Sequence, residues 1–543
     1  MNNSERFRLT VSNPDVTGLV VVSCFDTQSS FVVRTVLPNH AYEYVASTMA
    51  FVGARISRSS DTFEDIFAEV YRLAGKAQKR LANIFRAYGH ASVAEMADMF
   101  VFLENISDYH AAKLFYESSF GAGQQRSTRY QDFELPILVS LLNYYPEASY
   151  TLDREFMIHQ RKSTDLYVKW RDRLEVAFAQ YFEIDENNKG QVSALTARTF
   201  DTARAFLLGG ITNRTSVAYL TQAREWAKII AIFKSEADPE LNRLGEQIEF
   251  LLAPTEALAE QVGYTPEAPD LIRYTQSDET TLRARSNLNH WYQEHRFLLL
   301  ATDDLRPIEQ DVELVDLMYG SEKLFAQALL SINPKLRLEN ILAYLRNLCS
   351  GEKRKLSHLL LDEYDCYRQM PEWLGTNSHT FELDCTYAEY RDFNRHRVWN
   401  KFVPLFSSGD KCAALGYGVI LPLYLEVPGL DRFREEFSDD CLGLQESARQ
   451  LAQQLRDTDA ALDYLAPQLS TFAANCRPVM SGSPKHISYM TDRRQKPGGH
   501  INYRDLSYRM AQAAAAKDPW LDAVQITDPA PDPASREQFL DRS

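Results

Sequence analysis

The pattern of apolar and polar positions predicts a chain that mixes short strands with long helices. Residues 18–36 are rich in Val, Phe and Thr, a composition typical of strands. Over 62–86 and 91–117, apolar residues recur at three- and four-residue spacing, which predicts buried helix faces. FVFLENI (101–107) is short, apolar and β-prone, and predicts a strand between helices. The predicted fold class is therefore α+β, with small, mainly antiparallel sheets packed against long helices.

The same order of elements returns later in the chain. The pattern is mostly helical from 165 to 252, and the polar, Pro-rich residues 254–270 predict a linker. TFELDCTY (380–387) predicts another strand, and helical spacing resumes at 442–466 and 502–516. Placing Phe102 against Phe381 aligns the two short strands and the segments after them without a gap. These features predict an internal repeat of two similar domains.

Composition narrows the class of protein. A chain of 543 residues with 45% hydrophobic content can bury at least two cores. The start, MNNSERFRLT, lacks the apolar region of a secretory signal, and no apolar run approaches the roughly 20 residues that cross a bilayer. Seven cysteines without a CxxC pair fit reduced thiols. The net charge of −15 argues against a nucleic-acid surface. We expect a cytoplasmic enzyme or binding protein, with no nucleic-acid or membrane partner.

The segment 87–130 carries a group of motifs that suit a phosphorylated ligand. Gly89, His90, Ser92 and Glu95 form a GHxSxxE pattern, and the loop GAGQQRSTRY ends in Ser127, Arg129 and Tyr130. Small residues let the backbone approach a phosphate closely, and arginine matches its oxygens in a bidentate way. This arrangement resembles the central segment of the flavin-dependent thymidylate synthase (ThyX) family. Arg204 and Arg224 resemble two later arginine positions of that family, and Ser57, in ARISRSS (54–60), resembles its N-terminal flavin-contacting turn.

The family's RHR triplet is present only in the second half. Arg395, His396 and Arg397 supply it, whereas the aligned positions of the first half hold Tyr116, Glu117 and Ser118. In the closing segment 464–506, Lys485 stands at an arginine position, Arg494 (or Arg493) at a nucleotide-contacting arginine, and His500 at a flavin-side histidine. Asp463 stands at the position that matches Arg204. The resemblance therefore predicts two ThyX-like copies that have lost different parts.

The resemblance implies a reaction and its cofactors. A ThyX-type enzyme methylates dUMP from methylenetetrahydrofolate, using FAD that NADPH has reduced. The cofactors carry the difficult chemistry, so the protein must bind and orient them. Nucleotide binding would fall to Ser127, Arg129, Arg204 and Arg494, and Arg395 and Arg494 are the candidate catalytic residues. Flavin binding would fall to Ser57, His90, Ser92, Glu95, Arg395, His396, Arg397 and His500. No metal ligand set is predicted.

The expected domain limits are 18–253 for the first copy, 254–285 for a linker, 286–526 for the second copy and 527–543 for a flexible tail. Family sites are shared between subunits of a homotetramer, so a two-copy chain needs only a homodimer to form a pseudo-tetramer. One site would combine Ser127 and Arg204 with the RHR triplet, and the site around Tyr116, Glu117 and Ser118 would be inactive.

Plainer interpretations stand beside these. Three successive helical residues point about 100° apart, so the triplet either serves a ligand between subunits or marks a helix end. Arg204 and Arg224 could form surface ion pairs, and His90 could be a turn residue. His110, in an amphipathic helix, is predicted to be structural. For the whole chain, the alternatives are a catalytically silent scaffold that binds flavin or nucleotide, and an enzyme that transfers a different one-carbon group.

Overall fold

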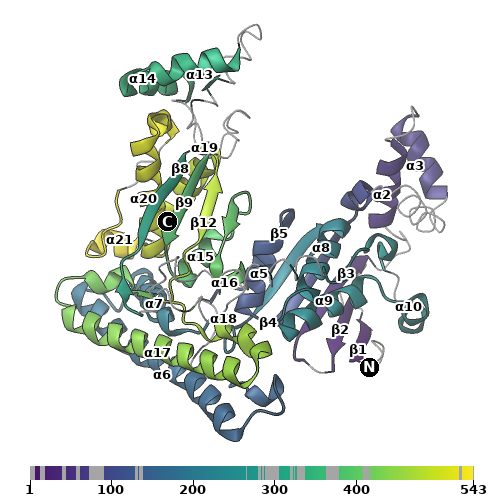
Figure 1. The fold of residues 1–543 in the computed structure, drawn as a ribbon, viewed down its shortest axis with the longest axis horizontal. Helices are drawn as coiled ribbons and strands as arrows, with labels where there is room; N and C mark the ends of the chain where they lie inside the picture. The colour runs from purple at the N-terminus through teal and green to yellow at the C-terminus, as the bar shows by residue number, and fades with distance from the viewer. Residues whose placement is uncertain are drawn as a thin grey trace. The chain divides into compact units, whose positions relative to one another are not determined.

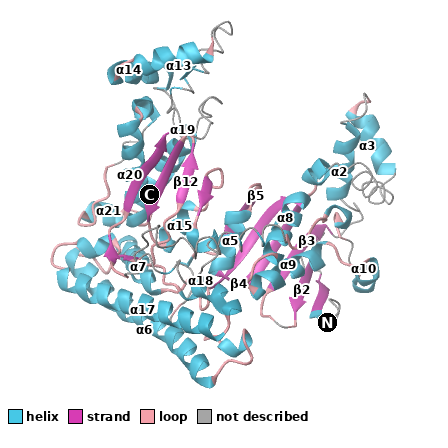
Figure 2. Ribbon diagram, viewed as in Figure 1, coloured by secondary structure: helices cyan, strands magenta, loops and turns pink. Residues whose placement is uncertain are grey.

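A computed structural model places most of the chain in two compact units. Unit 1 comprises 1–130 and 213–299, and unit 2 comprises 131–212 and 300–543. The structure describes residues 6–12, 19–27, 29–38, 45–56, 61–72, 91–128, 133, 138–263, 266–278, 283, 287, 305–317, 322, 325–326, 337–361, 378–407, 415, 418–524 and 529–541. The α+β class is confirmed, and Figures 1 and 2 show sheets and helices in both units.

Unit 1 is built on an antiparallel sheet with the strand order β1-β2-β3-β4-β6-β5. Its strands are β1 (Phe7–Ser12), β2 (Leu19–Asp26), β3 (Val32–Pro38), β4 (Asp98–Ser107), β5 (Gly121–Gln125) and β6 (Arg214–Gln222). Its helices are α2 (Val45–Ile56), α3 (Phe63–Arg72), η1 (Ala91–Met96), α5 (Asp108–Glu117), α8 (Ala223–Lys234), α9 (Pro239–Leu252), α10 (Glu256–Val262) and η5 (Pro269–Leu271). Fully buried Val101 and Leu103 of β4 and Trp226 and Ile230 of α8 join one hydrophobic core, which holds these helices on the sheet.

Unit 2 has a smaller antiparallel sheet with the order β10-β12-β9-β8. Its strands are β8 (Asp311–Leu317), β9 (His379–Asp384), β10 (Asn400–Phe402) and β12 (Val479–Gly482), with a separate parallel pair of β7 (Pro307–Ile308) and β11 (Val419–Ile420). Its helices and short helical turns are η3 (Leu141–Asn143), α6 (Tyr150–Tyr181), α7 (Lys189–Ala203), η4 (Arg204–Phe206), α13 (Leu338–Asn347), α14 (Ser350–Leu361), α15 (Tyr387–Phe393), α16 (Pro404–Ser407), η9 (Leu423–Glu426), α17 (Asp431–Thr458), η10 (Ala460–Leu465), α18 (Ala466–Leu469), α19 (Pro484–Gln495), α20 (Ile501–Lys517), η11 (Pro519–Val524) and α21 (Arg536–Leu540).

The two sheets share a strand arrangement. In chain order, β3, β4, β5 and β6 take the spatial order β3-β4-β6-β5, and β8, β9, β10 and β12 take the order β8-β9-β12-β10. A helix follows β4 and β9 directly, and its N-cap is Ser107 in unit 1 and Thr386 in unit 2. These caps stand at equivalent positions when Phe102 is set against Phe381. The aligned segments therefore adopt the same local structure despite their low identity.

Several expectations need correction. The stretch read as helical between 165 and 252 contains the strand β6, whose side chains alternate between buried and partly exposed. Residues 91–117 are not one helix, because η1 and the strand β4 precede α5; the short strand itself is confirmed. The predicted linker includes α10 and η5, and Leu271 is buried in the core of unit 1.

The expected domain limits also differ from the compact units. Residues 131–212 of the first half pack in unit 2, where α6 lies against α17. The predicted flexible tail is wrong for 529–541, because this segment contains α21 and the side chain of Phe539 is fully buried. Both corrections have the same cause. A long amphipathic helix or an isolated aromatic residue indicates a buried surface, but the local pattern does not show which other segment packs against it.

Candidate functional site

A charged site of unit 2 lies around the partly buried residue Asp392. This residue lies in the last turn of α15, and Arg204 begins η4 directly after α7. Nη2 of Arg204 lies 3.7 Å from Oδ2 of Asp392, and Arg204 is only 5% exposed. Segments nearly 190 residues apart in the sequence therefore place opposite charges together inside one unit.

Asp392 faces four arginines, which we name the arginine cluster: Arg204, Arg391, Arg395 and Arg494. Burial alone would raise the pKa of the Asp392 carboxyl, but the four guanidinium groups outweigh it and hold this pKa below its ordinary value. Asp392 supplies one negative charge to this group, and Glu389, which also lies on α15, supplies a second carboxyl that interacts with Arg204. The arginines outnumber these two carboxyls, which favours an anionic ligand.

Arg204 itself has unused donors. Its Nε and Nη2 atoms are buried, and neither has a hydrogen-bond partner among the described residues. A buried donor without an acceptor costs about 1–3 kcal/mol, more when the group is charged. An anion with several acceptor oxygens, such as a phosphate, would satisfy these donors with charge-assisted hydrogen bonds.

His396 supports the cluster in its neutral form. The Nε atom of Arg494 donates to Nε2 of His396 at 2.8 Å, which requires that this ring nitrogen carry no proton. Burial, with the neighbouring Arg494 and Lys401, lowers the pKa of His396 to about 3. Arg395–Arg397 lie just beyond the end of α15, as the helix-end interpretation predicted. The histidine orients Arg494 without adding charge.

Lys401 of β10 is a further perturbed group next to the triplet. Its Nζ donates to Oδ1 and to the carbonyl oxygen of Asn394, at 2.9 and 3.1 Å. Burial and the charge of Arg397 lower the pKa of Lys401 to about 7. Burial is the larger cause of this lowered pKa, and the charge of the triplet adds to it.

A buried acid–histidine pair lies beside the cluster. Nδ1 of His500, the N-cap residue of α20, is 3.5 Å from Oε1 of Glu389, and its Nε2 faces the carbonyl oxygen of Asp201 at 3.0 Å. Burial raises the pKa of Glu389 to about 7, and the charge of Arg204 opposes this rise. Because a carbonyl oxygen can only accept, Nε2 carries the proton in this contact, and in the neutral ring Nδ1 is the acceptor that faces Glu389.

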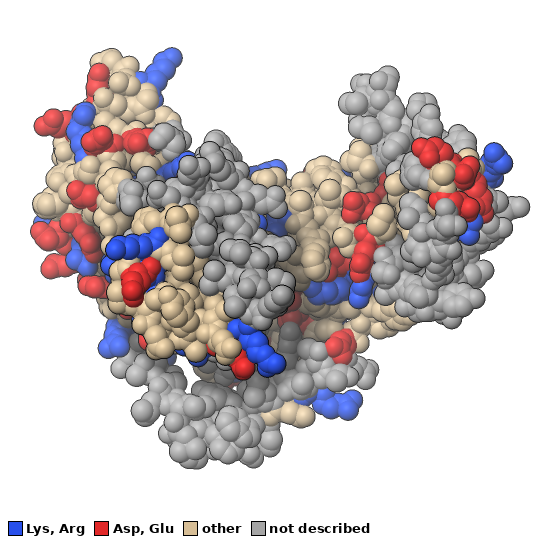
Figure 3. Space-filling model, turned by 90° about the horizontal axis from the view of Figure 1, so that it is seen from above, with Lys and Arg blue, Asp and Glu red and all other residues tan. Residues whose placement is uncertain are grey.

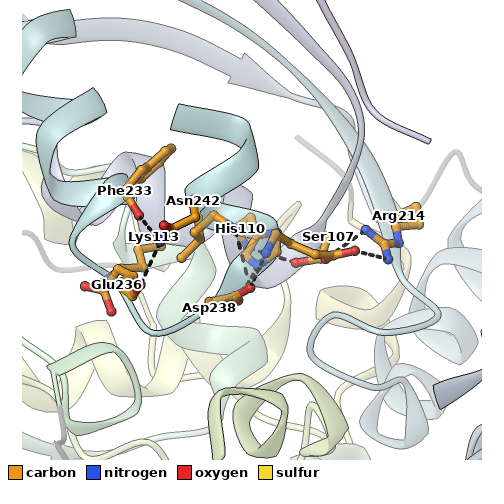
Figure 4. A network of polar contacts seen from close by, with 10 residues as sticks. Ser107, His110, Lys113, Arg214, Phe233, Glu236, Asp238 and Asn242 are labelled. Atoms are coloured by element: carbon orange, nitrogen blue, oxygen red, sulfur yellow. Dashed lines mark hydrogen bonds and ion pairs between the residues drawn. The ribbon is translucent and has the colours of Figure 1, made fainter. Parts of the chain in front are cut away.

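The equivalent region of unit 1 is closed by its own acids (Figure 4). Lys113, fully buried on α5, contacts Glu117 and Glu236 at 3.0 Å each. Burial would lower the pKa of Lys113, but these two carboxylates raise it above its ordinary value. Nε2 of His110 lies 2.7 Å from Oδ2 of Asp238, the N-cap residue of α9. His110 is buried, as expected of a structural residue.

The first half's triplet positions also serve unit 1. The backbone oxygen of Glu117 accepts from Nζ of Lys228 at 3.1 Å. Tyr219 donates its hydroxyl to Oγ of Ser118. Both contacts lie within unit 1.

The structure brings together some predicted residues and not others. Arg204, Arg395, His396, Arg494 and His500 meet in unit 2. In unit 1, Glu95 pairs with Arg224 on the surface, both well exposed, and Ser127 is half-buried after β5. The predicted residues that lie outside the described part of the chain are Ser57, His90 and Arg129, and the side chain of Ser92 is not described.

Asp392, Glu389 and Lys401 were missed by sequence reasoning. Asp392 stands three residues before Arg395, so a search of the helical turn before the triplet could have found it. Asp463, at the position matching Arg204, pairs with Arg456 at 2.6 Å. That pair gives Asp463 a local role and leaves the second half without an equivalent of Arg204.

Among the described residues, no group of His, Cys, Asp and Glu is arranged to hold a metal ion, and no helix combines the length and apolarity needed to span a membrane. Figure 3 shows acidic and basic side chains interspersed on the visible face.

Part of the chain matches a known protein family. Residues 33–254 match the family model described as "Thymidylate synthase complementing protein". The family resemblance is confirmed over these residues. The thymidylate synthase complementing protein match runs from β3 to two residues beyond the end of α9, and so includes α7 and Arg204.

One relative and two solved structures are similar to parts of this chain at low sequence identity. A "UPF0159 protein" of Chlamydia muridarum (strain MoPn / Nigg) is 22% identical over 452 residues, 80% of this chain and 78% of the relative. A solved UMP/dUMP methylase PolB from Streptomyces cacaoi, bound with 5-Br dUMP, has 16% identity and a TM-score of 0.30, covering 41% of this chain and 96% of that chain. The flavin dependent thymidylate synthase ThyX from Helicobacter pylori, complexed with FAD and dUMP, has 16% identity and a TM-score of 0.24, covering 42% and 96%.

Proposed function

We propose that this protein is a flavin-dependent enzyme of the thymidylate synthase type, which methylates dUMP from methylenetetrahydrofolate with FAD and NADPH. The family match over 33–254 supports the reaction class. The observation that carries the proposal is the arginine cluster, in which buried Arg204 has unused donors and one carboxylate faces four guanidinium groups. A site that only stabilised the fold would be expected to balance these charges internally, as unit 1 does.

The cluster fits a phosphorylated nucleotide. Arg204 and Arg494 would bind the phosphate and orient the base, assisted by Ser127 and Arg129. Arginine forks bind phosphate oxygens in pairs, and burial strengthens each contact. Asp392 would keep the guanidinium groups apart and oriented before the ligand arrives.

The triplet fits the neighbouring cofactor. Arg395, which is exposed, and Arg397 would face the pyrophosphate of FAD, while neutral His396 holds Arg494. Ser57, His90, Ser92 and Glu95 complete the proposed flavin set, and His500 joins it through Glu389. FAD, once reduced by NADPH, supplies the hydride. The chain's own residues bind the ligands, exclude water and hold a proton on the Glu389–His500 pair.

We also infer that the chain is a tandem repeat whose copies have divided the site. Matching strand orders and N-caps support the duplication. Arg204 comes from the first copy and Arg395, His396 and Arg494 from the second, yet all four lie in one compact unit. A homodimer would supply the rest of a four-domain assembly. In unit 1 the equivalent region is already occupied by its own acidic side chains. This supports the proposal that only one class of site is active.

A direct test is to measure the flavin spectrum of the purified protein, its reduction by NADPH, and its binding of dUMP by calorimetry. We expect a yellow protein that NADPH bleaches and that binds dUMP at micromolar concentration. Complementation of a thymidine-requiring strain then tests thymidylate synthesis itself. Flavin and dUMP binding without turnover would support the silent scaffold, and turnover to another product would support a different one-carbon transfer. A colourless protein that binds neither FAD nor dUMP would refute the proposal.

A further inference from the structure

We propose that the C-terminal segment, residues 529–541, is a clasp that positions His500 and Glu389 beside the arginine cluster, and that Arg198 is the positioning residue that connects them. The clasp itself is argued from contacts within unit 2. Only its effect on ligand binding rests on the proposed function.

The segment is anchored in a buried aromatic pocket. Phe539 is fully buried and stacks on Phe182, with ring centroids 3.8 Å apart, while Tyr424 lies edge-on at 5.5 Å. Arg536 adds a hydrogen bond from its Nε to the carbonyl oxygen of Phe182 at 2.7 Å. An aromatic ring buried to this extent removes a large apolar surface from water, which holds a short helix such as α21 in place.

A second attachment ties the segment to α20. Nη2 of Arg504 donates to Oε1 of Gln538 at 3.0 Å, and Nε of Arg504 donates to the carbonyl oxygen of Gln495 at 3.0 Å. Arg504 is 1% exposed. The clasp therefore contacts the helix that follows His500, and the same arginine of that helix also contacts the end of the helix that carries Arg494.

Arg198 joins the clasp to the turn before His500. This α7 residue is 1% exposed, and its guanidinium donates only to backbone carbonyl oxygens among the hydrogen bonds observed. Two acceptors lie in the turn, Gly499 and Pro497, each at 2.7 Å. Two lie in the clasp, Phe539 at 3.3 Å and Asp541 at 2.8 Å. The fork thus binds two chain segments at once, which the single ammonium group of lysine cannot reproduce with the same geometry.

The same turn is held again one helical turn along α7. The carbonyl oxygen of Asp201 contacts Nε2 of His500, three residues after Arg198. These two contacts define where the imidazole lies, and Nδ1 then faces Glu389 at 3.5 Å. Because the Glu389 carboxyl is coupled to the charge of Arg204, the position of the turn affects the cluster. Loosening the clasp should therefore loosen the site.

The test uses the full chain with single substitutions. Phe539→Ala removes the anchor, Arg198→Lys removes the fork, and Arg536→Gln is a milder change if either of these fails to fold. Phe233→Ala, an equally buried phenylalanine in the core of unit 1, is the matched control for general loss of stability. Hydrogen exchange of residues 496–504 and calorimetric titration with dUMP are measured at a temperature where every variant remains folded by circular dichroism.

We expect the clasp variants to exchange the amides of 496–504 roughly tenfold faster, because a local opening has become easier, and the control to leave them unchanged. We expect dUMP to bind about 3- to 10-fold more weakly, the range for residues that act on a site indirectly. Unchanged exchange in every clasp variant would overturn the clasp. Faster exchange with unchanged dUMP affinity would overturn its link to the site. Faster exchange in a protein whose wild type binds no dUMP would leave the clasp standing and refute the proposed function instead.

Discussion

The helices α5 and α15 occupy equivalent places in units 1 and 2, yet their surroundings carry opposite charge balances. On α5, Lys113 is enclosed by Glu117 and Glu236. On α15, the aligned position is Asp392, and arginines surround it. One arrangement satisfies its charges internally, and the other keeps a cationic excess that a ligand can satisfy. The same framework can thus hold a structural ion pair or a binding site.

At a second pair of aligned positions, a histidine and a carboxylate have changed places between the two units. In unit 1 the helix carries His110 and the N-cap of α9 carries Asp238; in unit 2 the helix carries Glu389 and the N-cap of α20 carries His500. Each unit keeps a histidine–carboxylate contact at this junction. The difference shows that the contact tolerates reversal, whereas the charge beside it decides whether the site can bind an anion.

The largest expected effect is a loss of stability in unit 1, where buried Lys113 pairs with two carboxylates. Lys113→Met would leave Glu117 and Glu236 without their shared cation, and removal of one partner from a buried ion pair costs about 3–5 kcal/mol. Urea unfolding measures the loss of stability. The affinity for dUMP of the folded variant should be unchanged. A weaker affinity would show that unit 1 also binds the nucleotide and would break the contrast between the units.

The next largest effect is expected at the arginine cluster of unit 2. Arg204→Ala should weaken dUMP binding about 30- to 100-fold, because it removes charge-assisted hydrogen bonds to the phosphate. Calorimetry provides the measurement. Uridine, which lacks the phosphate, should bind the variant and the wild type alike. If both ligands lost affinity equally, Arg204 would be a fold residue rather than a phosphate ligand.

A smaller effect concerns pH. Burial raises the pKa of Glu389 to about 7, so this group stabilises the fold below pH 4.5, and its contribution is lost as pH rises through 7. Glu389→Gln keeps a neutral side chain and removes that titration. Between pH 4.5 and 7.5, the free energy of unfolding of the wild type should fall relative to this variant by about 1–3 kcal/mol. Parallel curves would show that folding does not raise the pKa of Glu389.

The smallest expected effect is at the exposed pair of Glu95 and Arg224. Their side chains are 42% and 55% exposed, so the pair should contribute no more than about 1 kcal/mol in a double-mutant cycle. Flavin affinity gives the sharper measurement, because Glu95 is also a predicted flavin residue. If Glu95→Gln left flavin binding unchanged, the predicted flavin-binding role of Glu95 would be wrong. Unit 1 would then contribute fewer residues to the site than proposed.

The amino-acid sequence by itself determined the α+β class, the strands β4 and β9, and the family resemblance, because alternation, helical spacing and short motifs are local properties. The family resemblance also named Arg204, Arg395, His396 and Arg494 and assigned Arg204 and the triplet to one site. Only the tertiary structure placed Arg204 beside Asp392, enclosed Lys113 between acids and packed Phe539 of the clasp against Phe182. Burial and charge balance depend on residues hundreds of positions apart, and no local pattern contains the distances between them.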